Sequence, residues 1–391
     1  MTQTPLMPVH MRRDRFDPDA ILAEFRREQP VTRITMPWGT QAWLVTRYED
    51  VREVLGDATR FSNANRPMPG PGLQTESDGM LLAYDPPEHT RLRRLLTAEF
   101  TMRRMQRLEP RVTEIVTDHL DAMERTGAPA DLVSAFALPV PSLVISELLG
   151  VPYEDRVEFQ RHSNARLDMS LPMEERVAAI TAARAYMAEF VRRQRLNPGD
   201  DLLGMLVREH GDDVTDKELA GIGDLLLIAG HETTANMLGL GTLLLLQNPD
   251  QLALVRDRDD AVEPAIEELL RYLTIVHSGI PRGVTTDTTL SGQRLAAGDI
   301  VVVSLPSANR DAALGEDMDT FDITRKAARH VAFGHGVHHC LGAPLARMEM
   351  RTAFPALFRR FPGLRLAVPI DEVPLRAYSF VYGVSSLPVA W

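Results

Sequence analysis

The sequence predicts a mainly α protein with a minor β part, folded as a single domain over residues 1–391. Helical spacing of apolar residues dominates up to residue 273 and returns at 342–360. Between these stretches, residues 279–305 hold β-branched runs broken by Gly and Asp, which indicate a small sheet. The chain shows no internal repeat and no low-complexity tract, so one continuous core fits better than separable domains.

The N-terminal half is expected to alternate helices with loops. Helices are expected at 15–30, 48–58, 102–125, 140–149, 153–166 and 174–196, and short strands at 31–36 and 41–46. Residues 62–84 are rich in Pro, Gly, Ser and Asn, which predicts a long loop of the kind that often carries function. Asp85 is a candidate cap for the next helix, because Pro86 and Pro87 suit a first helical turn.

The C-terminal half contains the most apolar segment, residues 219–246. Thr215 and Glu218 form a capping-box pattern that opens this helix. Three titratable residues interrupt the segment, namely Asp224, His231 and Glu232. Because charges at the centre of a bilayer are costly, we expect a buried helix and no membrane span. Further helices are expected at 250–273 and 342–360, with strand-like pieces at 362–391.

Composition and charge narrow the function classes. Lys and Arg number 43 against 54 Asp and Glu, for a net charge of −11, which argues against a general nucleic-acid binder. A single cysteine cannot form an internal disulfide, which suits a reducing compartment. The N-terminus has no apolar core of the signal-peptide type, so we expect a cytoplasmic protein with flexible residues 1–14.

The single cysteine, Cys340, lies in the stretch FGHGVHHCLG, residues 333–342. A zinc site is one alternative, but the glycines at 334 and 336 argue against the helix that would bring His335 and His339 together, and no fourth ligand is evident. A cysteine nucleophile needs a base oriented by an acid, and no such acid stands out. A buried structural thiol and a ligand to haem iron are the remaining alternatives. A thiolate ligand would be favoured by the N-terminus of the helix that follows Cys340.

This stretch resembles the cysteine-ligand loop of the cytochromes P450, Phe-Gly-x-Gly-x-His-x-Cys-x-Gly. The matching positions are Phe333, Gly334, Gly336, His338, Cys340 and Gly342. The resemblance covers about residues 15–391 and implies a helical body with small antiparallel sheets that binds haem b. It also implies that Cys340 is the axial ligand of the iron and that His338 points at a haem propionate, with His335 and His339 incidental.

The long apolar helix contains Ala229-Gly-His-Glu-Thr-Thr234. Taken alone, this motif is more often a notch for helix packing with a Thr bonded back to the preceding turn. Beside the cysteine loop it resembles the oxygen-binding helix of the cytochromes P450. The resemblance implies that Ala229 and Gly230 leave room for dioxygen, and that Thr233 and Glu232 deliver protons.

Two further groups match the family. Glu268 and Arg271 lie on one helix face, and the family pattern adds a downstream arginine, here Arg325 in Phe321-Asp-Ile-Thr-Arg325. The resemblance implies a buried structural triad.

It also implies that the haem propionates meet cationic partners. These partners are His89 and Arg93 on one helix and Arg282 on a strand. One departure is the segment AALGEDMDT after Asp311, where the family usually has a Pro-rich run.

The implied activity is that of a haem-thiolate monooxygenase, which hydroxylates or epoxidises a lipophilic small molecule with dioxygen. A secondary metabolite such as a polyketide, macrolide, terpenoid or steroid-like compound is expected by analogy. A peroxygenase or an enzyme of oxidative rearrangement would share the cysteine loop but should have altered Thr233 or Glu232. A haem sensor or carrier would not need that pair.

The implied partners are a ferredoxin and its NAD(P)H-dependent reductase, because the sequence has no flavin or nicotinamide fingerprint. We expect the ferredoxin to dock on a locally basic face. The candidate residues are Arg94, Arg103, Arg104, Arg107, Arg347, Arg351, Arg359 and Arg360.

We expect the substrate pocket to be lined by the 62–84 loop, the 166–175 turn and a set of apolar residues. These are Leu226, Ala229, Val276, Ile280, Phe380 and Val381. His277 is either a polar substrate contact or an exposed loop residue.

Overall fold

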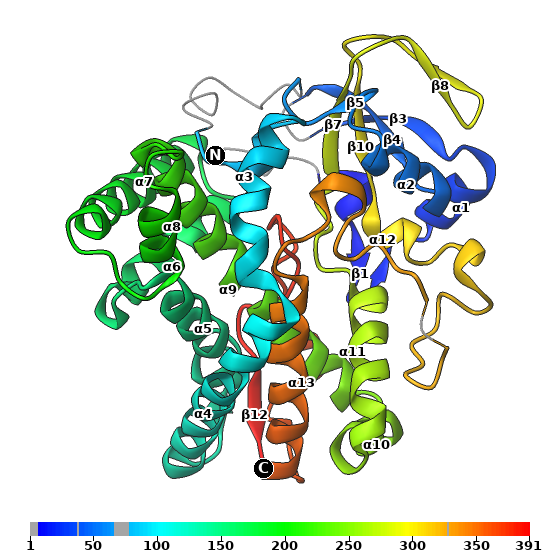
Figure 1. The fold of residues 1–391 in the computed structure, drawn as a ribbon. Helices are drawn as coiled ribbons and strands as arrows, with labels where there is room; N and C mark the ends of the chain where they lie inside the picture. The colour runs from blue at the N-terminus through cyan, green and yellow to red at the C-terminus, as the bar shows by residue number, and fades with distance from the viewer. Residues whose placement is uncertain (1–6, 37–38, 66–77, 327) are drawn as a thin grey trace.

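The computed structural model describes residues 7–36, 39–65, 78–326 and 328–391. Its helical body confirms the mainly α prediction (Figure 1). The helices are α1 Ile21–Glu28, α2 Tyr48–Gly56, α3 Glu88–Thr97, α4 Met102–Thr126, α5 Pro139–Leu149, α6 Arg156–Leu167, α7 Met173–Leu196, α8 Leu202–His210, α9 Asp216–Leu246, α10 Pro249–Asp257, α11 Asp259–Leu273, α12 Leu305–Ala308 and α13 Ala343–Arg360. Within the described residues, no helix combines the length and apolar character needed to cross a bilayer.

The β part is a set of small sheets beside the helical body. The largest runs in the order β3-β4-β10-β7-β5, and its strands are β3 Val31–Thr35, β4 Gln41–Val45, β5 Phe61–Ser62, β7 Ile280–Val284 and β10 Ile300–Val303. The smaller sheets pair β1 Arg13–Asp14 with β2 Asp17–Pro18, β8 Thr288–Leu290 with β9 Gln293–Leu295, and β12 Pro388–Ala390 with β6 Ala130–Asp131 and β11 Arg365–Leu366. Strands β4 and β10 are parallel, whereas the other pairs are antiparallel as expected.

Helix α9 is the central element of the fold. The predicted capping box is present, since Thr215 accepts from the backbone N–H of Glu218 and the Glu218 side chain accepts from that of Thr215. The helix packs against α5 on one side, where a Cβ on Gly230 would lie 2.6 Å from Ile145. It also approaches α13, which begins directly after the cysteine loop. Residues of the Ala229–Thr234 motif line the same cavity as Cys340.

Several predicted boundaries were wrong. The first helix begins at Ile21 rather than at 15, because residues 13–18 pair as the β1–β2 hairpin. The predicted helix 250–273 is two helices, since the backbone of Arg258 is extended. Asp85 does not cap α3: its carboxylate accepts hydrogen bonds from Ser62 and from the backbone of Asn63 at 2.8 Å.

The N-terminal segment, expected to be flexible over 1–14, is anchored from residue 9 on. Residues 1–6 lie outside the described residues. His10 is buried, and its Nε2 lies 2.9 Å from the carbonyl oxygen of Ser278. Arg13 donates to the carbonyl oxygens of Leu273 and Thr274, both at 2.7 Å, and so satisfies the end of α11. Of the predicted 62–84 loop, residues 66–77 likewise lie outside the described part.

Candidate active site

A cavity of about 330 Å³ lies between α3, α9 and the start of α13. The sequence-predicted residues that line it are His89, Arg93, Leu226, Ala229, Gly230, Thr233, Val276, Ile280, Phe333, His338, Cys340 and Gly342. Four others are not part of its lining, namely Glu232, Arg282, Phe380 and Val381. Most of the wall is apolar, which suits a lipophilic occupant.

The cysteine loop folds so that the Cys340 side chain opens onto this cavity. Gly334 and Gly336 have φ of +73° and +70°, and a Cβ on Gly336 would lie 2.5 Å from the carbonyl oxygen of Leu55. Both positions therefore require glycine. The backbone N–H of Cys340 donates to Phe333 at 2.9 Å and closes the loop. Gly342 has an ordinary φ of −79°, so backbone strain does not explain its presence.

The Cys340 sulfur is placed to become a metal-bound thiolate. Burial is the largest influence and raises the pKa of the thiol. The backbone N–H groups of Gly342 and Ala343 and the charges of Arg93 and Arg347 lower the pKa in opposition. A thiol of this kind stays neutral alone, but these groups would stabilise the thiolate once a metal displaced the proton.

Two histidines at the cavity wall lack partners for their ring nitrogens. His89 and His338 lie with ring centroids 4.1 Å apart, and His89 Nδ1 and both nitrogens of His338 are buried without a hydrogen bond among the described residues. Burial, His89 and Arg282 lower the pKa of His338 to about 3, so its imidazole is neutral. With Arg93 also lining the cavity, these groups fit a ligand that carries carboxylates. They therefore fit haem, whose propionates would supply the missing acceptors.

The alternative of zinc finds no support in the described residues, which contain no cluster of three or more His, Cys, Asp or Glu side chains that could hold a metal ion. His339 and His335 lie on the exposed or half-exposed part of the loop. The donor set at Cys340 is thus a single sulfur beside an apolar cavity. That arrangement suits a metal whose other ligands come from a cofactor.

The α9 motif presents Thr233 to the cavity. Its hydroxyl donates to the carbonyl oxygen of Ala229 at 2.7 Å, the back-bonded arrangement typical of a helix-interior threonine. Gly230 also lines the cavity, but its missing Cβ faces Ile145 of α5. Close packing of two helices therefore accounts for this glycine.

Glu232 lies on another face of α9. The side chain is buried, and its Oε2 accepts from Arg376 Nη1 at 2.9 Å, while its Oε1 lies 3.4 Å from His231 Nε2. Burial is the largest influence and raises the pKa of Glu232, but His231 and Arg376 together outweigh burial and lower the pKa below its ordinary value. The carboxylate is therefore ionised and paired. Sequence reasoning missed Arg376, because nothing near residue 376 signals a contact with residue 232.

Glu349 is a second functional candidate that sequence reasoning missed. It lies on α13, lines the cavity and is 1% exposed, and its Oε2 has no hydrogen-bond partner in the described part of the chain. Burial raises its pKa well above the ordinary value, so the acid is neutral. A signal was present: Glu349 follows the buried Leu345 by one helical turn, on the apolar face of the helix.

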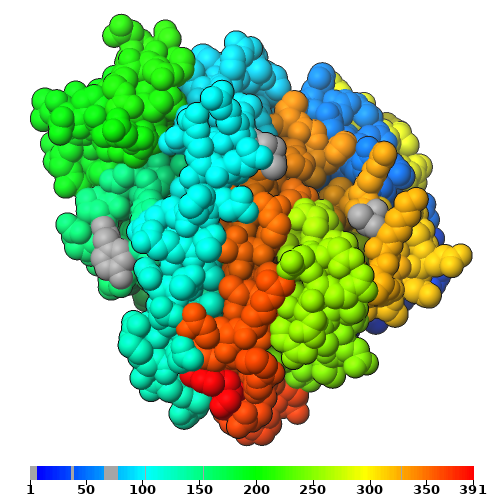
Figure 2. All heavy atoms as spheres, turned by 60° about the horizontal axis from the view of Figure 1, so that its bottom comes forward, coloured from blue at the N-terminus to red at the C-terminus, as the bar shows by residue number. Residues whose placement is uncertain are grey.

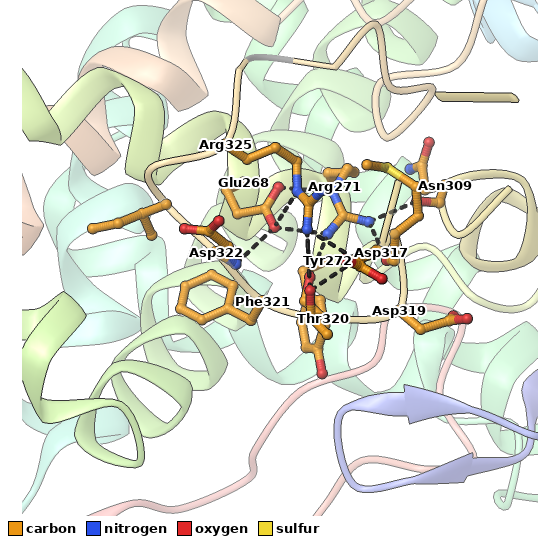
Figure 3. A network of polar contacts seen from close by, with 12 residues as sticks. Glu268, Arg271, Tyr272, Asn309, Asp317, Asp319, Thr320, Phe321, Asp322 and Arg325 are labelled. Carbon is orange, nitrogen blue, oxygen red and sulfur yellow. Dashed lines mark hydrogen bonds and ion pairs between the residues drawn. The ribbon is translucent and has the colours of Figure 1, made fainter. Parts of the chain in front are cut away.

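The structure brings the predicted triad together (Figure 3). Arg271 makes two hydrogen bonds to Glu268, each of 2.7 Å, and Arg325 Nε lies 3.5 Å from Glu268 Oε1. Arg271 is 1% exposed and donates further to the carbonyl oxygens of Asn309, Met318 and Thr320. The triad thus fixes the segment that leads from the sheet to the cysteine loop.

The predictions for Phe380 and Val381 as cavity residues were wrong. Val381 is buried and bridges to Val276 through the backbone, and the Phe380 ring lies under the guanidinium of Arg176 at 5.4 Å. The 166–175 turn is likewise absent from the described cavity wall.

His277 is neither a substrate contact nor an exposed loop residue. It is 0% exposed, and its ring nitrogens lie 3.1 Å from the carbonyl oxygen of Met11 and 2.8 Å from that of Ser379. It joins the N-terminal segment to the tail, which is a structural role.

Comparisons with known proteins agree with this site. The family model described as "Cytochrome P450" matches residues 9–365. The chain is 46% identical to "Cytochrome P450 FAS1" of Rhodococcoides fascians, over 100% of both chains. It is 42% identical to "Mycinamicin IV hydroxylase/epoxidase" of Micromonospora griseorubida, over 94% of each. The solved structure of CYP105P1 in complex with filipin I superposes with a TM-score of 0.93 at 46% identity, covering 97% of each chain.

Proposed function

The chain belongs to the cytochrome P450 family, and we propose that Cys340 would hold its haem iron as a thiolate ligand, in a single domain spanning residues 1–391. Members of this family are haem-thiolate monooxygenases, so the protein is an oxidoreductase that uses haem b, dioxygen, redox partners and a lipophilic substrate. The observation that carries the proposal is the position of the Cys340 sulfur, which opens onto an apolar cavity at the N-terminus of α13, opposite Thr233.

Each residue has a proposed part in this reaction. Haem, when bound, supplies the activation of dioxygen and the oxidation of an unreactive C–H bond. Cys340 would hold the group from the loop before α13. Arg93 and Arg282 would neutralise its two carboxylates, and the imidazoles of His89 and His338 would offer them hydrogen bonds. Thr233 places a hydroxyl in the cavity, where it can donate and accept a proton, and Glu232 replenishes that proton from solvent.

The ligand assignment is tested by reducing the purified holoprotein, adding carbon monoxide and recording a difference spectrum. We expect the strongly red-shifted Soret band of thiolate-ligated haem in the wild type, and loss of that band in Cys340→Ser with haem retained. Thr352→Ser, on α13 but outside the cavity wall, is the matched control. A wild-type spectrum typical of histidine-ligated haem would contradict the assignment.

We propose a neutral lipophilic secondary metabolite as substrate. The named activities of two relatives, a mycinamicin IV hydroxylase/epoxidase and a nocardicin C N-oxygenase, support a secondary metabolite but do not bear on its charge. The walls support it as well, because Leu226, Val276 and Ile280 offer no charge to a substrate. Titration of macrolides and other polyketides against the ferric holoprotein should give saturable spin-state shifts, and Leu226→Asp should weaken them at least tenfold. Binding of charged hydrophilic compounds alone would contradict the proposal.

We propose a small acidic ferredoxin, reduced by an NAD(P)H-dependent reductase, as the electron donor. Figure 2 shows α3 and α4 beside α13 on one face. The candidate arginines there divide into two groups. Arg104, Arg347, Arg351, Arg359 and Arg360 pair with carboxylates of this chain. Arg94, Arg103 and Arg107 are exposed and have no ion pair within the described residues, so they are the charges most accessible to a partner. A thiolate ligand and a single cysteine both suit a reducing cytoplasm.

A further inference from the structure

One wall of the cavity is carried by residues 274–279, which connect α11 to β7. Ile275 and Val276 of this connection line the cavity, as does Ile280 at the start of β7. The connection contains one isolated bridge, from Val276 to Val381, and no helix or longer strand in the part of the chain that the structure describes. The positions of these apolar side chains therefore depend on the segments packed behind the connection.

The N-terminal strap, defined as His10 to Arg13, packs behind this connection. His10 Nε2 lies 2.9 Å from the carbonyl oxygen of Ser278. Arg13 donates from Nη1 to the carbonyl oxygen of Leu273 and from Nη2 to that of Thr274, both at 2.7 Å. Neither His10 nor Arg13 is part of the cavity lining. The strap therefore holds both ends of the connection from outside the cavity, and β1, which contains Arg13, lies at the end of α11 (Figure 1).

The bond from His10 to the connection is a buried one. His10 is 1% exposed, and burial, the largest influence, lowers its pKa to about 4, so the ring is neutral and carries one N–H. Its Nδ1 is buried without a hydrogen bond among the described residues, so Nε2 carries the proton and donates it to Ser278. Removal of the ring would leave a buried carbonyl oxygen of the connection without its donor.

The His10 ring also fills space beside Gly279. Gly279 has a φ of +81°, and a Cβ there would lie 2.3 Å from Val302 of β10 and 3.4 Å from the His10 ring. The connection therefore packs closely against both β10 and the strap. Replacement of the ring by a methyl group would leave a void directly behind the connection, into which this wall of the cavity can relax.

We propose that His10 and Arg13 are positioning residues that determine substrate specificity. By holding both ends of the connection, they fix Ile275 and Val276 in the cavity wall and so set the length and bulk of the lipophilic molecule that fits. The inference deepens the proposed function and rests on it, because it requires that the cavity binds the substrate.

The test uses N-alkylimidazoles of increasing chain length, from butyl to dodecyl, as probes of the ferric holoprotein. The imidazole ring binds at the iron and the chain lies against the cavity walls, so dissociation constants read from the Soret shift report how well the chain fits. Unsubstituted imidazole carries no chain and is the reference. For each variant, the quantity compared is the dissociation constant of each alkylimidazole divided by that of imidazole.

We expect His10→Ala to accept longer chains than wild type does. If the void admits one further methylene, the ratio for the longest chains should fall by about fourfold, while the ratio for the butyl chain should not fall. His10→Gln keeps a donor within reach of Ser278 and should restore most of the wild-type pattern. His10→Leu fills the space without a donor and should lie between His10→Ala and wild type.

The second position gives an independent comparison. Arg13→Gln releases the start of the connection and should shift the ratios for the longer chains to a similar extent. Arg13→Lys can still donate to one of the two carbonyl oxygens and should shift them less. The control is Arg12→Gln, since Arg12 is exposed and its Nε donates to the carbonyl oxygen of Met7 at 3.0 Å. This variant should leave every ratio unchanged.

Urea unfolding of the same holoproteins separates specificity from stability. Lowered stability with wild-type ratios in both His10→Ala and Arg13→Gln would give the strap a purely structural role and overturn the inference. Should His10→Ala fail to fold, His10→Leu and Arg13→Lys carry the comparison. If wild type binds no alkylimidazole more tightly than imidazole, the lipophilic cavity of the proposed function fails first. A wild-type preference for chains that every variant retains unchanged would refute the inference alone.

Discussion

Two acids near the cavity have opposite surroundings. Glu232 is ionised because Arg376 and His231 face it, whereas Glu349 is neutral because burial alone acts on it among the described residues. The protonation state of neither carboxyl group could be predicted from the sequence. The cysteine loop was predictable because its pattern is local, but the partner of Glu232 lies 376 − 232 = 144 positions away. Long-range pairs leave no periodic trace, which is why Arg376 was missed while Cys340 and Thr233 were found.

Glu349 should make stability depend on pH. Its folded pKa is raised above that of the unfolded chain, so its contribution to stability is fully present below the ordinary carboxyl pKa and is lost as pH rises through the folded value. Glu349→Gln removes this loss. Relative to wild type, we expect the free energy of unfolding of Glu349→Gln to rise with pH above the ordinary carboxyl pKa, by up to about 1.4 kcal/mol per pH unit while Glu349 stays protonated in the folded wild type.

The measurement is urea unfolding of the holoproteins at several pH values. Glu209→Gln, at an exposed position of α8, is the control and should follow wild type throughout. A constant difference between Glu349→Gln and wild type across these pH values would show that the acid is already ionised in the folded protein.

At the scale of elements, the segment between α12 and the cysteine loop has little regular structure and depends on the triad. The hydrogen bonds that a sheet or helix would provide are supplied there by the side chain of Arg271. It donates to the carbonyl oxygens of Asn309, Met318 and Thr320 (Figure 3). The i,i+3 spacing of Glu268 and Arg271 made their contact predictable. Helix α8 was missed, and the division between α10 and α11 was not foreseen, since the apolar spacing runs on through residues 250–273.

Removing one member of the triad should destabilise the fold and the haem site together. Arg271→Ala leaves a buried carboxylate and three carbonyl oxygens without their donor, so we expect a loss of roughly 3–5 kcal/mol in the free energy of unfolding, with poor haem retention. Chemical denaturation and the haem-to-protein absorbance ratio measure both effects. Arg351→Ala, which breaks a partly exposed pair with Glu263, should cost less than about 1 kcal/mol. Equal losses in the two variants would contradict the structural role.

At the scale of the whole molecule, the net charge is −11, but one face carries a local group of arginines. The net charge follows from the composition, and the arginines that form this surface could be named from the sequence. Which of them are neutralised by neighbouring helices could not be read, because Glu263, Glu267 and Asp259 come from α11, a different part of the chain. The surface left for a partner is therefore smaller than the sequence suggested, and it lies on α3 and α4.

Reduction by an acidic ferredoxin should fall as salt rises, because opposite charges steer the two proteins together. Charge reversal at Arg94, Arg103 and Arg107 should lower the second-order reduction rate by tenfold or more at low ionic strength and flatten its salt dependence. Stopped-flow reduction in varied sodium chloride measures this. Reversal at Arg359, which is paired with Asp259, should have a smaller effect. A salt-independent rate in the wild type would rule out an electrostatic docking surface.

The strand order β3-β4-β10-β7-β5 has a consequence for synthesis on the ribosome. Strand β4 ends at Val45, but its parallel neighbour β10 ends at Val303. One edge of the β3–β4 hairpin therefore has no partner strand until 303 − 45 = 258 further residues have been synthesised. Over that interval the nascent chain exposes an apolar strand edge, a surface on which aggregation begins. Slow translation before residue 303, or a shortage of chaperone, should therefore lower the yield of soluble protein more than the stability of the finished fold would suggest.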